Sequence, residues 1–167
     1  MSLAGQRLQP NRYSLIPRTL TFLTRQDQVL LLRLSPDRGE WAGLLNGVGG
    51  HVEPGEDPLQ SARREIEEET GLSPSDLRLA GVVIIDTGSS PGIGLYVFVG
   101  KAEEGKPRVG SEGTPEWISL NTLDDASLVE DLPILLPKAL ASYEKPIPFS
   151  ARYEYDEAGA LRIRFSE

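Results

Sequence analysis

The sequence predicts an α/β fold in which one domain, spanning residues 1–167, combines a mixed β-sheet with two main helices. Short apolar or alternating runs typical of strands recur along the chain, and two longer segments instead show the residue spacing of helices. A length of 167 residues with 39% hydrophobic residues also suits a single domain that buries one core.

The predicted strands precede, separate and follow the two helical segments. Residues 18–25 alternate apolar and polar side chains, and residues 29–34 form an apolar run beyond the turn at Gln26-Asp27-Gln28, so they predict a strand pair. Three further strands and a C-terminal hairpin are expected at residues 79–86, 94–99, 116–120, 150–156 and 160–165.

The first helix is predicted over residues 58–70 from its start and stop signals. Asp57 is a capping residue, Pro58 suits the first helical position, and Gln60 completes a pattern resembling a capping box. Gly71 is a natural helix end. The second helix is expected over residues 131–143, with a prolyl residue tolerated in its first turn.

Composition excludes several classes of function. A formal net charge of -8 argues against binding a nucleic acid polymer, because such binding depends on clustered Lys and Arg. The chain has no cysteine, so any metal must be held by oxygen ligands or by His51, the one histidine. Neither a signal peptide nor a membrane-length apolar run is present, so a cytoplasmic protein without a membrane partner is expected.

Glutamates are concentrated on one flank of the first predicted helix. At the helical repeat, Glu65, Glu68 and Glu69 lie at i, i+3 and i+4, whereas Glu67 points elsewhere. Three neighbouring carboxylates repel one another, and a hard divalent cation such as Mg²⁺ relieves that repulsion. The alternative is a solvated acidic face, which is what most acidic runs on helices form.

A glycine-rich segment precedes this helix. Asn46-Gly47-Val48-Gly49-Gly50 permits a close approach of backbone carbonyl and amide groups to an ion or a phosphate, because glycine has no Cβ. The sequence therefore predicts that this segment and the acidic helix contribute to one site.

The spacing over this whole region resembles the Nudix box. Its constrained positions all occur without a departure, and they are Gly50, Glu56, Arg64-Glu65, Ile66, Glu68-Glu69, Gly71 and Leu72. The resemblance implies a Nudix-type α/β/α sandwich with a mixed sheet between helices. It also implies Mg²⁺-dependent hydrolysis of a nucleoside diphosphate linked to another group X, with Mn²⁺ as a possible substitute for Mg²⁺.

The resemblance assigns roles to individual residues. Glu65, Glu68 and Glu69 correspond to metal ligands, one of which assists deprotonation of the attacking water. Arg64 and Glu56 correspond to an ion pair that orients the helix, and the Gly49 carbonyl corresponds to a further ligand. A fourth acid is expected from a distant loop, and Glu112 is preferred to Glu116, the alternative being that Glu112 is merely an exposed loop residue.

Within the family the chain is nearest to the 8-oxo-dGTP diphosphatase branch. Asn46 resembles the purine-contacting Asn of that branch, and Glu130-Asp131 resembles its paired acids, although a turn and a helix cap are the alternative roles. Leu128-Val129 stands where the mammalian enzymes have an aromatic residue, so Trp41 or Phe22 is expected to stack on the base unless it belongs to the core.

The expected substrate is thus a purine nucleoside triphosphate, oxidised or not, cleaved to monophosphate and pyrophosphate by a monomer or homodimer. Hydrolysis of ADP-ribose or another nucleotide sugar is an alternative, although Thr87 and Ser89 stand where the competing branches tend to have Pro and Tyr. A non-catalytic nucleotide sensor is a further alternative, and the complete acid set argues against it. His51 is expected to have no catalytic role.

Overall fold

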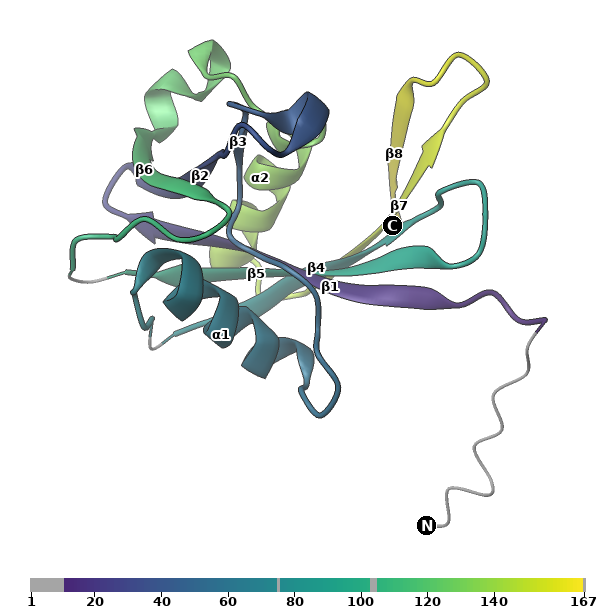
Figure 1. Cartoon of the computed structure of the whole chain (residues 1–167), viewed down its shortest axis with the longest axis horizontal. Helices are drawn as coiled ribbons and strands as arrows, with labels where there is room; N and C mark the ends of the chain where they lie inside the picture. Colours follow the sequence, from purple (N-terminus) through teal and green to yellow (C-terminus); the bar gives the residue numbers. More distant parts are fainter. Residues whose placement is uncertain (1–10, 75, 103–104, 167) are drawn as a thin grey trace.

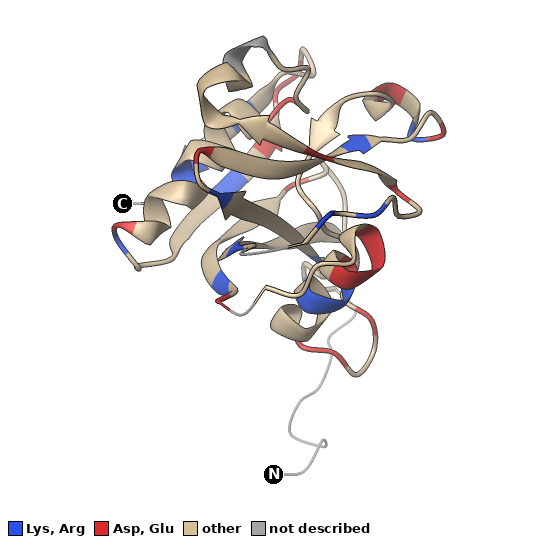
Figure 2. Ribbon diagram, turned by 90° about the vertical axis from the view of Figure 1, so that its left-hand side faces the viewer, with Lys and Arg blue, Asp and Glu red and all other residues tan. Residues whose placement is uncertain are grey.

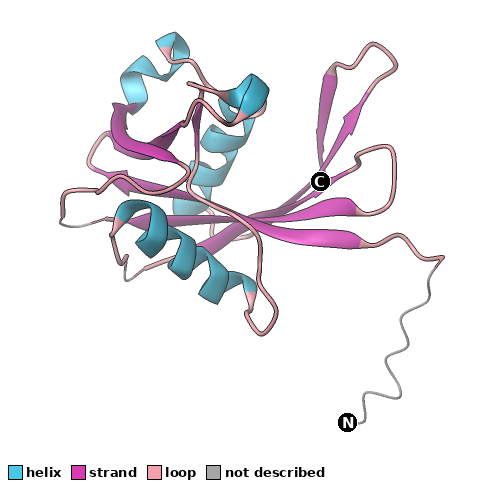
Figure 3. Cartoon of the chain, in the orientation of Figure 1, coloured by secondary structure: helices cyan, strands magenta, loops and turns pink. Residues whose placement is uncertain are grey.

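The fold comes from a computed structural model of the chain that describes residues 11–74, 76–102 and 105–166. Figures 1 and 3 show a twisted sheet with one helix in front of it and one behind. The strands are β1 (Leu15–Arg25), β2 (Gln28–Leu34), β3 (Leu45–Asn46), β4 (Arg78–Ile85), β5 (Gly92–Lys101), β6 (Gly113–Ser119), β7 (Phe149–Tyr155) and β8 (Leu161–Phe165). The α-helices are α1 (Pro58–Thr70) and α2 (Leu132–Leu140).

The sheet is mixed, as predicted. Its strands are ordered β3-β2-β1-β5-β4-β7-β8, and β6 pairs with β2. The β1–β5 and β4–β7 pairs are parallel, whereas the remaining strand pairs are antiparallel. Parallel neighbours must be joined by a long crossover, so the chain passes through the glycine-rich segment and α1 before it returns to the sheet.

The two helices cover the sheet and bury the core. Helix α1 packs against β1 and β6, and α2 packs against β5, β1 and β4. The largest side chains that are fully buried come mainly from β1, β2 and α2, and they include Phe22, Leu23, Leu30, Leu31, Leu32, Leu132, Leu135 and Leu136. The central sheet is therefore a rigid support for the loops at its edge.

Helix α1 has the predicted bounds because its start and end are locally encoded. The Asp57 side chain accepts hydrogen bonds from the Leu59 and Gln60 amides, and the Gln60 side chain accepts one from the Asp57 amide. Gly71 ends the helix in the left-handed conformation, with φ of 70°. The buried face carries Ile66, and Glu65 and Glu69 are buried beside it.

Several element bounds differ from the sequence predictions. Strand β1 begins at Leu15 because its pairing with β5 starts there, opposite Gly92, and β6 begins at Gly113, opposite Leu34 of β2. The short strand β3 and a 3₁₀ helix at Gly39–Trp41 were not predicted, since neither carries a local repeat. Helix α2 starts at Leu132 and ends at Leu140, and residues 141–143 continue it only as a 3₁₀ turn.

The glycine-rich segment lies along β1 and leads from β3 to α1. The Thr19 and Thr21 amides donate to the Gly50 and Val48 carbonyls at 2.9 and 2.6 Å. A Cβ on Gly49 would collide with the Thr19 carbonyl, and one on Gly50 would collide with the Glu65 carboxylate. Both glycines are therefore required by the close approach of β1 and α1.

Within the described ranges, no helix has the length and apolar character needed to cross a bilayer.

Replacing Asp57 with Ala is expected to lower the thermal midpoint of unfolding by roughly 2–4 °C, since a lost N-cap costs about 1 kcal/mol. Thermal unfolding followed by circular dichroism measures the change. Asp57→Ser is the matched control and should stay near the wild type, because Ser can also cap. An unchanged midpoint in Asp57→Ala would contradict the capping role.

Candidate active site

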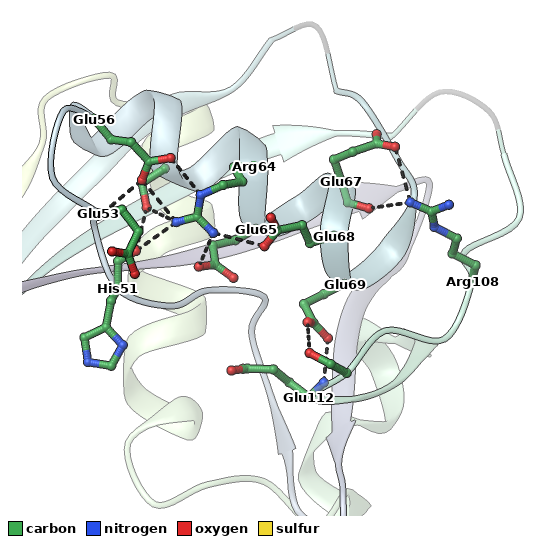
Figure 4. A network of polar contacts seen from close by, with 12 residues as sticks. His51, Glu53, Glu56, Arg64, Glu65, Glu67, Glu68, Glu69, Arg108 and Glu112 are labelled. Atoms are coloured by element: carbon green, nitrogen blue, oxygen red, sulfur yellow. Dashed lines mark hydrogen bonds and ion pairs between the residues drawn. The ribbon is translucent and has the colours of Figure 1, made fainter.

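Arg64 is the centre of the polar network on α1. Its Nε and Nη2 donate to the two carboxylate oxygens of Glu56 at 2.7 and 3.1 Å, a bidentate pair. Its Nη1 donates to Glu65 at 2.8 Å and to Glu68 at 3.0 Å, and Nη2 also donates to the His51 carbonyl at 3.0 Å. Figure 4 shows how this one side chain ties the loop before the helix to the carboxylates on it.

Glu65 is a buried carboxylate in an electronegative surrounding. It is 8% exposed and lies against Gly50. Burial raises its pKa; Arg64 partly offsets that rise, and the negative charges of Glu112 and Glu68 add to it. Figure 2 shows the acidic and basic residues of α1 side by side on one part of the helix. The ionised form of Glu65 is therefore disfavoured, chiefly by burial, in spite of its hydrogen bond to Arg64.

Glu69 connects α1 to a distant loop. It is 3% exposed, and its carboxylate accepts hydrogen bonds from the Ser111 hydroxyl at 2.9 Å and the Glu112 amide at 2.8 Å. The Glu112 side chain pairs with Arg38 at 2.8 Å. The structure thus brings Glu112 next to the acidic helix, whereas Glu116 pairs with Arg33 on the neighbouring strand.

Glu67 points away from this cluster, as predicted. Its carboxylate pairs with Arg108 at 3.4 Å, on the other side of the helix, and its side chain is 54% exposed. Figure 4 shows the separation between Glu67 and the carboxylates near Arg64.

The oxygen atoms near α1 are of the kind that a hard divalent cation binds. The groups available are carboxylates and the backbone carbonyls of the glycine-rich segment, which are the oxygen ligands that Mg²⁺ prefers. Across the described residues, no three acidic or histidine side chains converge closely enough to form a metal cluster, since Glu65 and Glu68 are directed to Arg64 and Glu69 to the loop. The raised pKa of Glu65 shows that more positive charge would be favourable there.

A pocket of about 250 Å³ adjoins the carboxylates. Five of the predicted site residues line it, namely Trp41, Asn46, Gly49, Glu112 and Asp131. Gly49 and Gly50 form the wall between the pocket and Glu65, and Glu112 contributes to the pocket while its amide bonds Glu69. A molecule in the pocket would therefore lie next to the acidic helix.

Asn46 enters the pocket from β3 with a defined amide orientation. Its Oδ1 accepts a hydrogen bond from the Gly47 amide at 2.8 Å. The side-chain NH₂ keeps two donors for a bound molecule. Asn46 thus makes the local turn contact that was its alternative role, and it also keeps its NH₂ group for a molecule in the pocket.

The two paired acids before α2 have different surroundings. Asp131 lines the pocket, and burial raises its pKa, with a further contribution from the charge of Glu130. Its side chain makes no capping hydrogen bond to the helix. Glu130 instead accepts a hydrogen bond from the Leu161 amide at 3.3 Å, so it anchors the β7–β8 hairpin and is not part of the pocket lining.

The two aromatic candidates are also separated. Trp41 is 51% exposed and lines the pocket from the 3₁₀ helix. Phe22 is 0% exposed and packs in the core. The expectation that Phe22 stacks on a base is wrong. Its ring is on the same face of β1 as Leu20, but it lies against Gly47 and is fully buried, so no bound base can reach it.

Other pocket residues were not identified from the sequence. Ile85, Ile93 and Leu95 form an apolar floor, and Arg18 and Arg38 add positive charge. The alternation in β1 places Arg18 on the same face as Leu20, which was the available signal for Arg18. The floor residues come from β4 and β5, and only the pairing of these strands with β1 assembles them.

Comparison with known proteins identifies the family. The model of the NUDIX domain matches residues 15–139. The oxidized purine nucleoside triphosphate hydrolase of Mus musculus is 35% identical over 121 residues, covering 70% of this chain and 77% of that protein. The 8-oxo-dGTP diphosphatase of Escherichia coli (strain K12) is 33% identical over 95 residues, covering 56% of this chain and 71% of that protein.

The fold is also shared with solved structures. The mMutator MutT protein from Bacillus halodurans superposes with a TM-score of 0.70 at 23% identity, covering 91% of this chain and 98% of that chain. This similarity extends the shared fold beyond the residues matched by the family model.

Replacing Glu65 with Gln is expected to raise the thermal midpoint of unfolding at pH 7. The pKa of Glu65 is raised in the folded protein, so its ionised form destabilises the fold at neutral pH. The gain should shrink as the pH falls through the raised pKa, because the wild-type carboxyl then becomes neutral. Thermal unfolding in metal-free buffer from pH 4 to 8 tests this, with Glu67→Gln as control. A lower midpoint for Glu65→Gln at pH 7 would show that Arg64 outweighs the burial cost.

Proposed function

The chain belongs to the Nudix hydrolase family, and on that premise we propose that it hydrolyses a purine nucleoside triphosphate, with an oxidised purine favoured, to the monophosphate and pyrophosphate. The observation that carries the proposal is that the pocket and the acidic surface of α1 adjoin each other. A pocket containing Asn46 and Asp131 shares the Gly49–Gly50 wall and Glu112 with the acidic surface of α1. The names of the two relatives support the choice of substrate.

We assign the metal-binding role to Glu65, Glu68, Glu69, Glu112 and the Gly49 carbonyl, with Mg²⁺ as the ion and Mn²⁺ as a substitute. Since the Val48 and Gly50 carbonyls accept hydrogen bonds from β1, the alternation of extended backbone turns the Gly49 carbonyl away from that strand. When bound, the ion supplies charge neutralisation of the phosphates and a lower pKa for the attacking water.

The remaining groups position and orient the reactants. Arg64 holds Glu65 and Glu68 in place through its bidentate bond to Glu56. One of the α1 carboxylates accepts the proton of the attacking water. In the pocket, Asn46 donates to acceptors on the base edge, Asp131 pairs with the same edge, and Trp41 covers a face of the base. The proposed setting is the cytoplasmic nucleotide pool, with the enzyme as a monomer or homodimer.

The matched pair Glu68→Gln and Glu67→Gln tests the function and the metal site together. Both side chains lie on α1, have similar exposure (55% and 54%) and form one ion pair with an arginine. The purified wild type with Mg²⁺ is expected to release pyrophosphate from nucleoside triphosphates, fastest with 8-oxo-dGTP. Glu68→Gln should lower kcat/KM at least about 100-fold because a charged ligand is lost, whereas Glu67→Gln should stay within about threefold.

Other outcomes have distinct meanings. A wild type that prefers ADP-ribose would contradict the proposed substrate while leaving the metal site intact. Equal effects of the two substitutions would remove Glu68 from the metal site.

A further inference from the structure

Arg18 is a positive charge in the pocket that the proposed metal site and base contacts do not use. It lies on β1 opposite Leu95 of β5, and the same sheet face continues through Ile93 to Ile85 of β4. These three aliphatic side chains, with Leu20, form the apolar floor of the pocket. Arg18 therefore places a guanidinium beside the apolar floor of the pocket.

His51 fixes the orientation of this guanidinium. Arg18 and His51 face each other across a β-bridge, and the Arg18 Nε donates to the His51 Nε2 at 3.1 Å. In this hydrogen bond Nε2 is the acceptor, so the other ring nitrogen, Nδ1, carries the N–H. The bond occupies one donor of Arg18 and leaves its two terminal NH₂ groups for a ligand.

Arg18 differs from the two other arginines near the site, Arg38 and Arg64, in its side-chain partner. Arg38 and Arg64 are each paired with a glutamate at 2.8 and 2.7 Å. Among the described residues, no Asp or Glu forms an ion pair with Arg18, whose side-chain hydrogen-bond partner is the His51 imidazole. In a chain of net charge -8, a conformationally fixed and unneutralised arginine that lines a pocket is an anion-binding group.

The direction of the glycine-rich segment indicates which end of the substrate lies at Arg18. From Asn46 to His51 the chain advances five residues, roughly 17 Å in extended backbone. A base at Asn46 therefore directs its phosphates along Gly49 and Gly50 toward His51 and Arg18. Arg18 lies at the far end of this path, beyond the Gly50 backbone that contacts Glu65.

We propose that Arg18, oriented by His51, binds the pyrophosphate part of the substrate and thereby selects an anionic group X over an uncharged sugar. This inference rests on the proposed function, and within it Arg18 is the residue that decides which group X is accepted. Arg18 touches the substrate, whereas His51 is a positioning residue. A fork of two N–H donors matches two phosphate oxygens, which a lysine ammonium cannot reproduce with the same geometry.

Product inhibition of the wild type and of Arg18→Gln tests the assignment. Pyrophosphate and the nucleoside monophosphate each serve as inhibitor of triphosphate hydrolysis, with free Mg²⁺ held constant because pyrophosphate binds the ion. The inhibition constant for pyrophosphate should rise roughly 10- to 100-fold in Arg18→Gln, the range expected for a lost charge-assisted hydrogen bond. The constant for the monophosphate should change less than about threefold.

Three further variants separate contact from structure. Arg25→Gln removes the same charge from the other end of β1, where the guanidinium lies 4.3 Å from the Trp117 ring, and it should leave both constants unchanged. Arg18→Lys should recover only part of the pyrophosphate affinity. His51→Phe should weaken pyrophosphate binding more than His51→Gln, since Gln retains an acceptor for the Arg18 Nε.

The outcomes are distinguishable. Equal changes in the two inhibition constants of Arg18→Gln would show a structural role, and no change would show that Arg18 does not touch pyrophosphate; either result overturns the inference alone. A wild type that releases no pyrophosphate from any triphosphate overturns the proposed function, and the inference with it.

Discussion

The bidentate ion pair between Arg64 and Glu56 is the interaction on which the site depends. Glu56 lies in the loop before α1, and Arg64 lies in the middle of the helix, two turns later. The same guanidinium bonds the His51 carbonyl, Glu65 and Glu68. One side chain therefore sets the position of the glycine-rich segment relative to the carboxylates, and the close approach at Gly50 follows from that position.

This arrangement is costly to the fold, which is characteristic of a functional site. Burial and the neighbouring negative charges raise the pKa of Glu65, so the ionised carboxylate is held against its preference for water. Core burial in β1, β2 and α2 offsets this cost elsewhere in the molecule. In the proposed function, a divalent cation would relieve this repulsion, and an anionic substrate would reach the acidic site together with its metal ion.

The sequence predicted the parts of the site that are encoded locally. Helix α1 was predicted to the residue because Asp57, Pro58, Gln60 and Gly71 specify its ends without tertiary contacts. The outward orientation of Glu67 followed from the helical repeat alone. The resemblance to the Nudix family, carried by the same local spacing, also anticipated the mixed sheet between two helices.

The remaining features depend on contacts between residues far apart in the chain. The hydrogen bond from the Glu112 amide to Glu69 spans 43 residues, and the pocket floor requires the pairing of β1, β5 and β4. Burial of Phe22 and exposure of Trp41 were both open from the sequence. The alternation of β1 groups Phe22 with Arg18 and Leu20, which line the pocket, and Trp41 lies in a segment without a repeat. Glu130 and Asp131 are adjacent, yet Glu130 accepts a hydrogen bond from Leu161 of the β7–β8 hairpin, whereas Asp131 lines the pocket.

A crystal structure with Mn²⁺ and a non-hydrolysable purine nucleoside triphosphate would test the central claim most directly. The account predicts anomalous density for the ion among the carboxylates of α1 and the Gly49 carbonyl, with the base at Asn46 and the phosphates passing Gly49 and Gly50. Metal density away from α1, or a nucleotide bound outside the pocket, would contradict the claim that the acidic helix and the pocket form one active site.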